Sequence, residues 1–531
     1  ATRFARRARA RCQGLRVLTL IHKFWSQSVP ITDVIANGSR EQRTRLGLNR
    51  RFTHDEDTLR AGGALGRRAV QRHRFRRSPS FKRVVRIAGV MAQAPDQSLP
   101  QQNKEWGELM GAYRFLNNSK TTPHQIQSTH RARVREQCRS RPVVLAVQDT
   151  SELDFTGRTV QGLGPIGNGG GQGLLQHSTL AIDPKGHLVG VLHQIWRLRV
   201  STPEGETRAE RRQRPRESDF WPESVRAVGS LGSTTRIVHV TDRGGDDFGT
   251  IIACREQENP GAPGTGVGFL IRARHDRWVN GGTDKLWSFM SRQSAPGYRN
   301  VPIESSTVNE RRIARVSIRY AHVRLDPPKG HPQFKDPIDV WVVYAGEENA
   351  PDGVEPIEWM LLTSEAVLTL ANAEERIDWY GLRWIIEEFH KSEKTGCRLE
   401  RVQLKSAEAI KRWAALVAIT AVRLIQLRDL AQGAVSETSD DPSSPANQPE
   451  ALQAFVPRPW VLIVAKLAQC DGIELTPRRF WLTIAKRGGY LARKGDGPPG
   501  WSTIWRGWYD IMLMVHGAEL LAPIAEGGTC V

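Results

Sequence analysis

Two short apolar segments that each end in an aspartate constrain the fold of this chain more than any other feature. Val143–Val147 is a continuous apolar run followed by Gln, Asp149 and Thr, and Arg236–Val240 is a second run followed by Thr, Asp242 and Arg. Runs of this length predict buried strands, and each strand would carry an aspartate at its polar tip.

The segment between these strands predicts a β-hairpin. His177–Ile182 and His187–Trp196 have strand patterns and are joined by Asp-Pro-Lys-Gly, a turn sequence. The glycine-rich stretch 162–173 before them lacks the Gly-Lys-Ser/Thr of a phosphate-binding loop, so we expect an ordinary mobile loop there. A β-rich insertion is expected over 258–351, followed by a strand at Trp359–Thr363 and a long helix over Asn372–Lys394.

The charge of the chain indicates a polyanionic partner. The 76 basic and 56 acidic residues give a net charge of +20, and the first 80 residues, with 18 Arg and one Lys against five acidic residues, carry +14 of it. A basic arm that neutralises phosphates explains this, so nucleic acid is the first candidate partner. A merely solvated extension is the alternative. No apolar run reaches the ~18 residues of a membrane span, and we expect a cytoplasmic protein without membrane partners.

The two strand-tip aspartates can form a metal site together with a glutamate from the later helix. A strand, a hairpin, a second strand and then a Glu-bearing helix is the chain order of an RNase H-like core. Three converging carboxylates offer the hard oxygen ligands that Mg²⁺ or Mn²⁺ prefers, and paired ions can activate an attacking oxygen and stabilise a leaving one at phosphorus. Strand-end aspartates more often cap turns, so the helix must decide between these readings.

One face of the expected helix carries four chemically useful side chains. At about 100° per residue, Tyr380, Arg383, Glu387 and Lys394 fall within about 60° of one another around the axis. A solvated face with an Arg383–Glu387 ion pair is the alternative interpretation. The spacing Tyr-x2-Arg-x3-Glu-x6-Lys is specific enough to favour a functional face.

This spacing resembles the YREK signature of DDE transposases of the IS4 family, the type that includes the Tn5 transposase. The resemblance covers about residues 81–531 and includes 111–118, 148–150, 241–243, 359–365, 421–427, 488–490 and 505–508. It implies Asp149, Asp242 and Glu387 as a metal-binding catalytic triad. The further residues that it places on the DNA path are Arg383 and Lys394 at phosphates, Tyr380 on the same strand, Trp359 stacked on a flipped base, and Arg272, Arg274 and His275 beside the insertion. A buried core position is the alternative for Trp359.

The resemblance also implies an architecture, a reaction and partners. We expect an α/β fold: an RNase H-like catalytic core with a β-rich insertion, flanked by helical N-terminal and C-terminal domains. Its parts would be a basic arm (1–80), a helical DNA-binding domain (81–140), the first part of the core (141–257), the insertion (258–351), the second part of the core (352–428), and a linker with a helical dimerisation domain (429–531). The implied reaction is cut-and-paste transposition through a DNA hairpin, with Mg²⁺ or Mn²⁺, on double-stranded transposon ends and target DNA in the bacterial nucleoid.

A homodimer would hold the two DNA ends, and the C-terminal apolar and aromatic residues (461–467, Trp501, Trp505, Trp508 and Tyr509) are candidates for its interface. Residues 1–80 depart from the family, since Leu65-Gly-Arg-Arg68 lacks the usual aspartate. A shifted reading frame upstream would explain this. It also keeps open a second function, a non-catalytic DNA-binding remnant or transposition inhibitor with a defective end-recognition domain.

Overall fold

The computed structural model describes residues 79–525, except for positions 168, 200–202, 204, 208–209, 211–213, 233, 260–263, 304–311, 330, 332, 433–444, 457, 494–495 and 497–498. Nearly all of the expected basic arm therefore lies outside the described residues. The chain forms two compact units. The sheet unit comprises His130–Thr159 and Leu163–His390, and the helical unit comprises the segments up to Thr129, Val160–Gly162 and from Lys391 onward.

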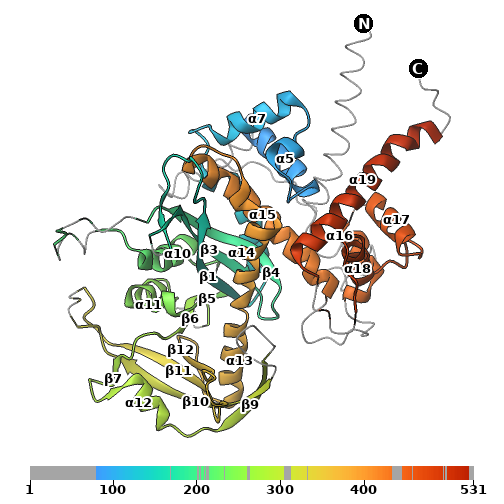
Figure 1. Cartoon of the computed structure of the whole chain (residues 1–531). Coiled ribbons are helices and arrows are strands. Elements are labelled where there is room, and N and C mark those ends of the chain that lie inside the picture. The colour runs from blue at the N-terminus through green and yellow to red at the C-terminus, as the bar shows by residue number, and fades with distance from the viewer. Residues whose placement is uncertain are drawn as a thin grey trace, which may run out of the picture. The chain divides into compact units, whose positions relative to one another are not determined.

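Five strands of the sheet unit form the expected RNase H-like core. They are β1 (Val143–Asp154), β3 (Gly171–Ile182), β4 (Leu188–Arg197), β5 (Arg236–Thr241) and β6 (Gly266–Arg272). β3 is antiparallel to both β1 and β4, whereas β1, β5 and β6 are parallel to one another. The order β4-β3-β1-β5-β6, with its single reversed inner strand, confirms both the hairpin and the α/β fold class (Figure 1).

The β-rich segment that follows extends this same sheet. β12 (Glu358–Thr363) pairs with β6 over Leu361–Thr363 and on its other side with β11 (Ile338–Glu347). β10 (Arg312–Leu325) comes next, and it pairs with β9 (Gly297–Ile303) and β7 (Trp278–Val279), which itself pairs with β8 (Asp284–Lys285). The short helix α12 (Leu286–Ser291) belongs to this part. The last strand of the core is thus connected to the insertion by backbone hydrogen bonds.

The glycine-rich stretch differs from expectation, because it is partly a strand. β2 (Gly164–Ile166) forms a hairpin with the first residues of β3. The glycines permit a close approach of strands: a Cβ at Gly173 would lie 2.0 Å from the carbonyl oxygen of Leu153.

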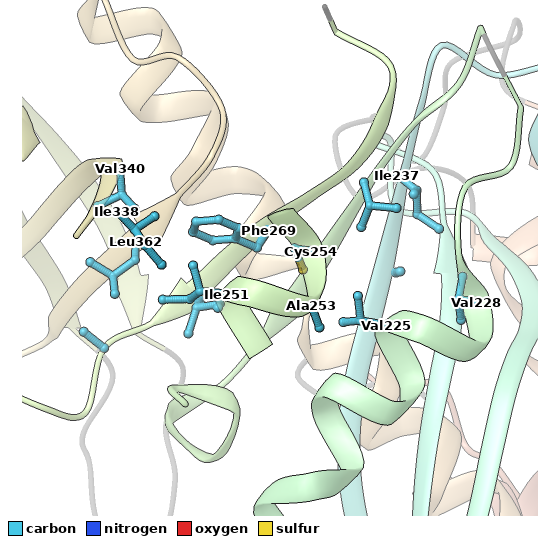
Figure 2. Packing of buried hydrophobic residues seen from close by; sticks show 14 of the residues in the cluster. Val225, Val228, Ile237, Ile251, Ala253, Cys254, Phe269, Ile338, Val340 and Leu362 are labelled. Carbon is cyan, nitrogen blue, oxygen red and sulfur yellow. The ribbon is translucent and has the colours of Figure 1, made fainter. Parts of the chain in front are cut away.

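Two helices close the core beside the parallel strands. Figure 2 shows α10 (Phe220–Val228) contributing Val225 and Val228, and α11 (Phe248–Arg255) contributing Ile251, to a buried cluster with Phe269 of β6. Ile338, Val340 and Leu362 continue this cluster into the extension. Burial of each side chain of this size contributes roughly 1.5–3 kcal/mol to the stability of the fold, so the strands that carry the aspartates are held by a well-packed core.

The helix expected over Asn372–Lys394 is interrupted. α13 (Leu370–Gly381) ends before α14 (Trp384–Lys391), and a π-helical turn, η4 (Ser392–Gly396), follows. The backbone N–H of Arg383 donates to the carbonyl of Tyr380, three residues back, at 3.0 Å. Such a tighter turn beside Gly381, a weak helix former, shifts the register, so a uniform helical wheel does not describe the four signature residues.

The helical unit confirms the helices expected at both ends of the described chain. Its helices are α5 (Pro79–Gln93), α6 (Leu99–Gln102), α7 (Trp106–Leu116), the first part of α8 (Pro123–Arg139), α15 (Ala407–Gln432), α16 (Pro449–Phe455), α17 (Arg458–Leu467), α18 (Pro477–Arg487) and α19 (Trp501–Ala525). Figure 1 labels all of them except α6 and α8. Buried Arg412 of α15 donates to the carbonyls of Leu116 at 2.9 Å and Thr121 at 2.6 Å and so joins α15 to the end of α7. No described helix is both long and apolar enough to cross a membrane.

The C-terminal tryptophans lie in the core of the helical unit. Trp505 is 1% exposed and packs 5.7 Å from Trp501 and 6.2 Å from Trp508, measured between ring centroids. The sequence allowed these rings to form an exposed surface for contact with a second copy. In the structure of one copy the three tryptophan rings are buried instead.

Candidate active site

The parallel pairing of β1 and β5 brings the two strand-tip aspartates to the same end of the sheet. The last registered pair is Val147 with Val240, and Asp149 and Asp242 each follow two residues later. Side chains two residues apart lie on the same side of a strand, so the two carboxylates are neighbours. The two carboxylates also interact electrostatically: after burial, the charge of Asp242 is the next cause of the raised pKa of Asp149.

A tight turn holds Asp242 in place. Its carboxylate accepts the backbone N–H of Gly244 at 2.8 Å, at the start of the single turn η3 (Arg243–Gly245). A Cβ at Gly244 would lie 2.9 Å from the Trp221 ring, and one at Gly245 would lie 2.4 Å from the hydroxyl of Thr241. The Asp-Arg-Gly-Gly sequence therefore permits a turn that a bulkier pair would push apart.

Glu387 completes a group of three interacting carboxylates. Burial, followed by the charge of Asp242, raises the pKa of Asp149 to about 6, and the charge of Glu387 adds to the rise. The guanidinium of Arg383 opposes it: one nitrogen lies 3.7 Å from Asp149 and another donates to Glu387. Arg383 thus bridges two of the three carboxylates and supplies positive charge where these carboxylates accumulate negative charge.

The donor set fits a divalent cation, although the side chains are not arranged around one. Among the described residues, no group of three or more His, Cys, Asp or Glu side chains is gathered closely enough to hold a metal. The three carboxylates are hard oxygen donors of the type selected by Mg²⁺ and Mn²⁺. Burial, followed by the neighbouring negative charges, raises the pKa of Asp149 despite the opposing charge of Arg383, and a bound cation would favour its ionised form.

Tyr380, Trp359 and Arg272 form a second group beside the carboxylates. The Trp359 ring meets the Tyr380 ring edge-on, with centroids 5.0 Å apart. Burial raises the pKa of Tyr380, whose hydroxyl interacts with Arg272. A cavity of about 550 Å³ adjoins this group, and its lining includes Arg243, Arg272, Arg299, Trp359 and Ile377. An aromatic ring among three guanidinium groups can accept both a base and the phosphates next to it.

Sequence reasoning missed Asp246, which organises the residues expected on the DNA path. Its buried carboxylate accepts the backbone N–H groups of Arg274 at 2.6 Å and His275 at 2.9 Å. It also forms a 2.5 Å ion pair with Arg277, whose side chain is only 10% exposed. The signal was present as a second aspartate four residues after Asp242. Arg274 and His275 are held through their backbones, which leaves their side chains available to a ligand.

Lys394, the last residue of the signature, belongs to the helical unit. It lies in η4, and its ammonium is 3.6 Å from a carboxylate oxygen of Glu400. The sheet unit holds nine of the ten expected site residues. Seven of them are brought together by the contacts just described (Asp149, Asp242, Glu387, Arg383, Tyr380, Arg272 and Trp359), and Asp246 binds the backbone of the other two, Arg274 and His275.

Comparisons with known proteins agree with this organisation. Residues 78–121 match a transposase DNA-binding family model, residues 263–423 match a transposase DDE domain, and residues 477–528 match the Tn5 transposase dimerisation domain. Among solved structures, a piggyBac transposase synaptic complex with hairpin DNA aligns at 11% identity over 78% of this chain and 76% of that one. Its TM-score of 0.30 is too low for this likeness to carry an argument.

Proposed function

We propose that this chain is a DDE transposase of the IS4 family, of the Tn5 type, which cuts and pastes its element with Asp149, Asp242 and Glu387 as the metal-binding triad. It is a DNA transposase whose partners are DNA and a second copy of itself. One observation supports the residue assignment: the parallel register of β1 and β5 sets Asp149 beside Asp242, and Arg383 contacts both Asp149 and Glu387. We propose the bacterial nucleoid as its place of action.

The three carboxylates would hold Mg²⁺ or Mn²⁺, and two such ions would activate the attacking oxygen and stabilise the leaving one. The chain's own contribution is to orient the DNA. Arg383, which now contacts the carboxylates of Asp149 and Glu387, would bind a phosphate beside the scissile bond if cations took up those carboxylates. Lys394 would add a second phosphate contact, as its place in the signature suggests.

The aromatic group explains how one site could serve several steps. Hydrolysis, attack of the freed 3′ hydroxyl on the opposite strand, hairpin opening and strand transfer are each displacements at phosphorus. A hairpin requires the strand to bend sharply, and a base displaced from the stack can be held by Trp359 beside the arginine-lined cavity. Tyr380, buried against this ring, keeps it in position.

The alternative of a non-catalytic remnant is not favoured. A chain without selection for catalysis has no need to keep three mutually repelling carboxylates, because their repulsion lowers the stability of the fold. Here all three residues are present, together with the Arg383 bridge.

The test is cleavage of a DNA fragment bearing the element's ends, with Mg²⁺ or Mn²⁺. Asp149→Ala, Asp242→Ala and Glu387→Ala should each abolish both nicking and hairpin formation while DNA binding persists. Glu388→Ala, on the adjacent position of α14, is the matched control and should cleave normally. The assignment is wrong if any triad variant cleaves at the rate of the unaltered protein.

A further inference from the structure

A chain of buried and partly buried hydrogen bonds lies behind Asp149, on the opposite face of β1. Gln148 and Thr150 flank Asp149, and because side chains alternate along a strand, both point away from the carboxylates. Thr150 bonds through its hydroxyl to Nδ1 of His177 at 2.8 Å, and Nε2 of His177 bonds to the Gln148 carboxamide oxygen at 3.0 Å.

The same chain continues across the sheet to β5. The Gln148 amide nitrogen lies 2.6 Å from Nδ1 of His239. With this carboxamide orientation the chain of hydrogen bonds runs in one direction: the Thr150 hydroxyl donates to His177, His177 donates to Gln148, and Gln148 donates to His239. The rings of His177 and His239 then each carry their proton on Nε2, and the buried Nε2 of His239 has no hydrogen-bond partner among the described residues. We call this set, Thr150, His177, Gln148 and His239, the strand brace.

The strand brace connects three strands at the level of the active site. Thr150 lies opposite His177 in the register of β1 and β3, while His239 lies opposite Ala146 in the register of β1 and β5. His177 is held in turn by Phe220 and Trp221, with ring centroids at 5.4 Å and 5.0 Å. Gln148 and both histidines are fully buried, and burial lowers the pKa of each histidine to about 3, so both rings are neutral.

The position of the brace distinguishes it from ordinary core packing. It holds the residues on both sides of Asp149 through side chains that lie on the opposite face of the sheet from the carboxylate. The backbone N–H of Thr150 is itself bonded to an Asp149 carboxylate oxygen at 2.8 Å. A rotation of the β1 tip that would move Asp149 away from Asp242 therefore has to break hydrogen bonds between buried polar groups, which is costly.

We propose that His177 and Thr150 are positioning residues that set the orientation of Asp149 toward the metal ions. The inference rests on the proposed role of Asp149 as a metal ligand. Partners that orient ligands typically change metal affinity or activity by about tenfold to a hundredfold when removed. The expected consequence is a weaker response to metal with an unchanged response to DNA.

A pair of identical substitutions tests this. Thr150→Val removes the hydroxyl that bonds to His177. Thr179→Val makes the same change on β3, where the buried Thr179 hydroxyl has no hydrogen-bond partner among the described residues. We expect Thr150→Val to raise the Mn²⁺ concentration for half-maximal cleavage by about tenfold or more, to weaken Mn²⁺ binding measured by electron paramagnetic resonance, and to leave the dissociation constant for end DNA unchanged. Thr150→Ser should restore both metal readouts, and Thr179→Val should change neither.

The other side of the same contact gives an independent check. In His177→Gln the amide nitrogen can replace Nε2 and still donate to Gln148, but nothing accepts the Thr150 hydroxyl. The double variant His177→Gln with Thr150→Val should depend on Mn²⁺ no more strongly than the more impaired single variant, because both substitutions remove the same Thr150–His177 hydrogen bond. If Thr150→Val and Thr179→Val showed the same dependence of cleavage on Mn²⁺, the proposed positioning role of the strand brace would be wrong. If Asp149→Ala itself still cleaves, the triad assignment fails instead, so the two failures are distinguishable.

Discussion

Asp149 is the residue at which function and stability oppose each other. Its pKa, raised to about 6 by burial and by the charge of Asp242, exceeds the ordinary value of 3.8. A raised carboxyl pKa means that the folded state binds the proton more tightly than the unfolded state. The resulting stabilisation is complete below about pH 4 and is lost as the pH rises through about 6. The metal-free protein is therefore destabilised by this carboxylate at neutral pH.

We accordingly predict that Asp149→Asn stabilises the metal-free protein at pH 7.5, by up to about 3 kcal/mol in urea unfolding, and has little effect at pH 4. Asp183→Asn is the control of opposite sign. Hydrogen bonds from His187 outweigh the burial of Asp183 and lower its pKa, so its carboxylate stabilises the fold above pH 4 and not below it. A loss of stability at pH 7.5 in Asp149→Asn would contradict the electrostatic account.

Trp359 separates two steps of the reaction. Its ring lines the arginine-bordered cavity and rests edge-on against Tyr380. We predict that Trp359→Ala slows hairpin formation by about tenfold or more relative to the first nick, because a stacked base contributes roughly 1–3 kcal/mol and only the hairpin needs it. Trp359→Phe should recover most of the rate. Both products can be followed on one denaturing gel, and equal loss of both would mean that Trp359 acts only as core.

The turn after β5 unites two functional segments. Asp242 begins η3, and Asp246 ends the same turn while it binds the backbone of Arg274 and His275 at the exit of β6. The carboxylate that we propose to be catalytic and the expected DNA-path residues are thereby held by one short segment. Because Asp246 and Arg277 are both buried, their ion pair cannot be broken cheaply.

From this pairing we predict that Asp246→Ala lowers the free energy of unfolding by about 3–5 kcal/mol, since Arg277 would remain charged and buried without its partner. The double variant Asp246→Ala with Arg277→Met should regain part of that loss in urea unfolding. It should still bind end DNA more weakly than the unaltered protein, because Arg274 and His275 lose their backbone acceptor. An Asp246→Ala protein as stable as the original would refute this role.

The assembled transposase requires a surface that a single copy leaves open. In the segment that matches the Tn5 dimerisation domain, Trp505 is buried, whereas Leu513 of α19 is 43% exposed. Exposed apolar residues of this kind are candidates for a contact between copies.

We predict that Leu513→Lys prevents the two-end complex in light scattering while the melting temperature stays almost unchanged, since exposed substitutions usually alter stability by no more than about 0.5 kcal/mol. Trp505→Ala is the contrasting variant and should cost about 3–5 kcal/mol through loss of core packing. If Leu513→Lys still paired two DNA ends, α19 would not supply the contact through this residue.

Local patterns were sufficient for much of this architecture. The apolar runs before Asp149 and Asp242 predicted their strands because continuous burial selects such runs, and Asp-Pro-Lys-Gly predicted the hairpin because its residues favour a turn. The spacing from Tyr380 to Lys394 identified the family. The uniform helix through these residues was wrong, because the turn at Gly381–Leu382 depends on hydrogen bonds that a periodic pattern does not reveal.

The sequence by itself indicated which residues are candidates for the chemistry, since carboxylates, guanidinium groups and aromatic rings at family spacing are visible one residue at a time. Only the tertiary structure decided what surrounds them. Asp246, His177 and Gln148 have no distinctive spacing, and their roles arise from strand register, which brings residues tens of positions apart within hydrogen-bonding distance. The burial of Trp505 was decided in the same way, because one helix cannot specify whether an aromatic face meets its own chain or another copy.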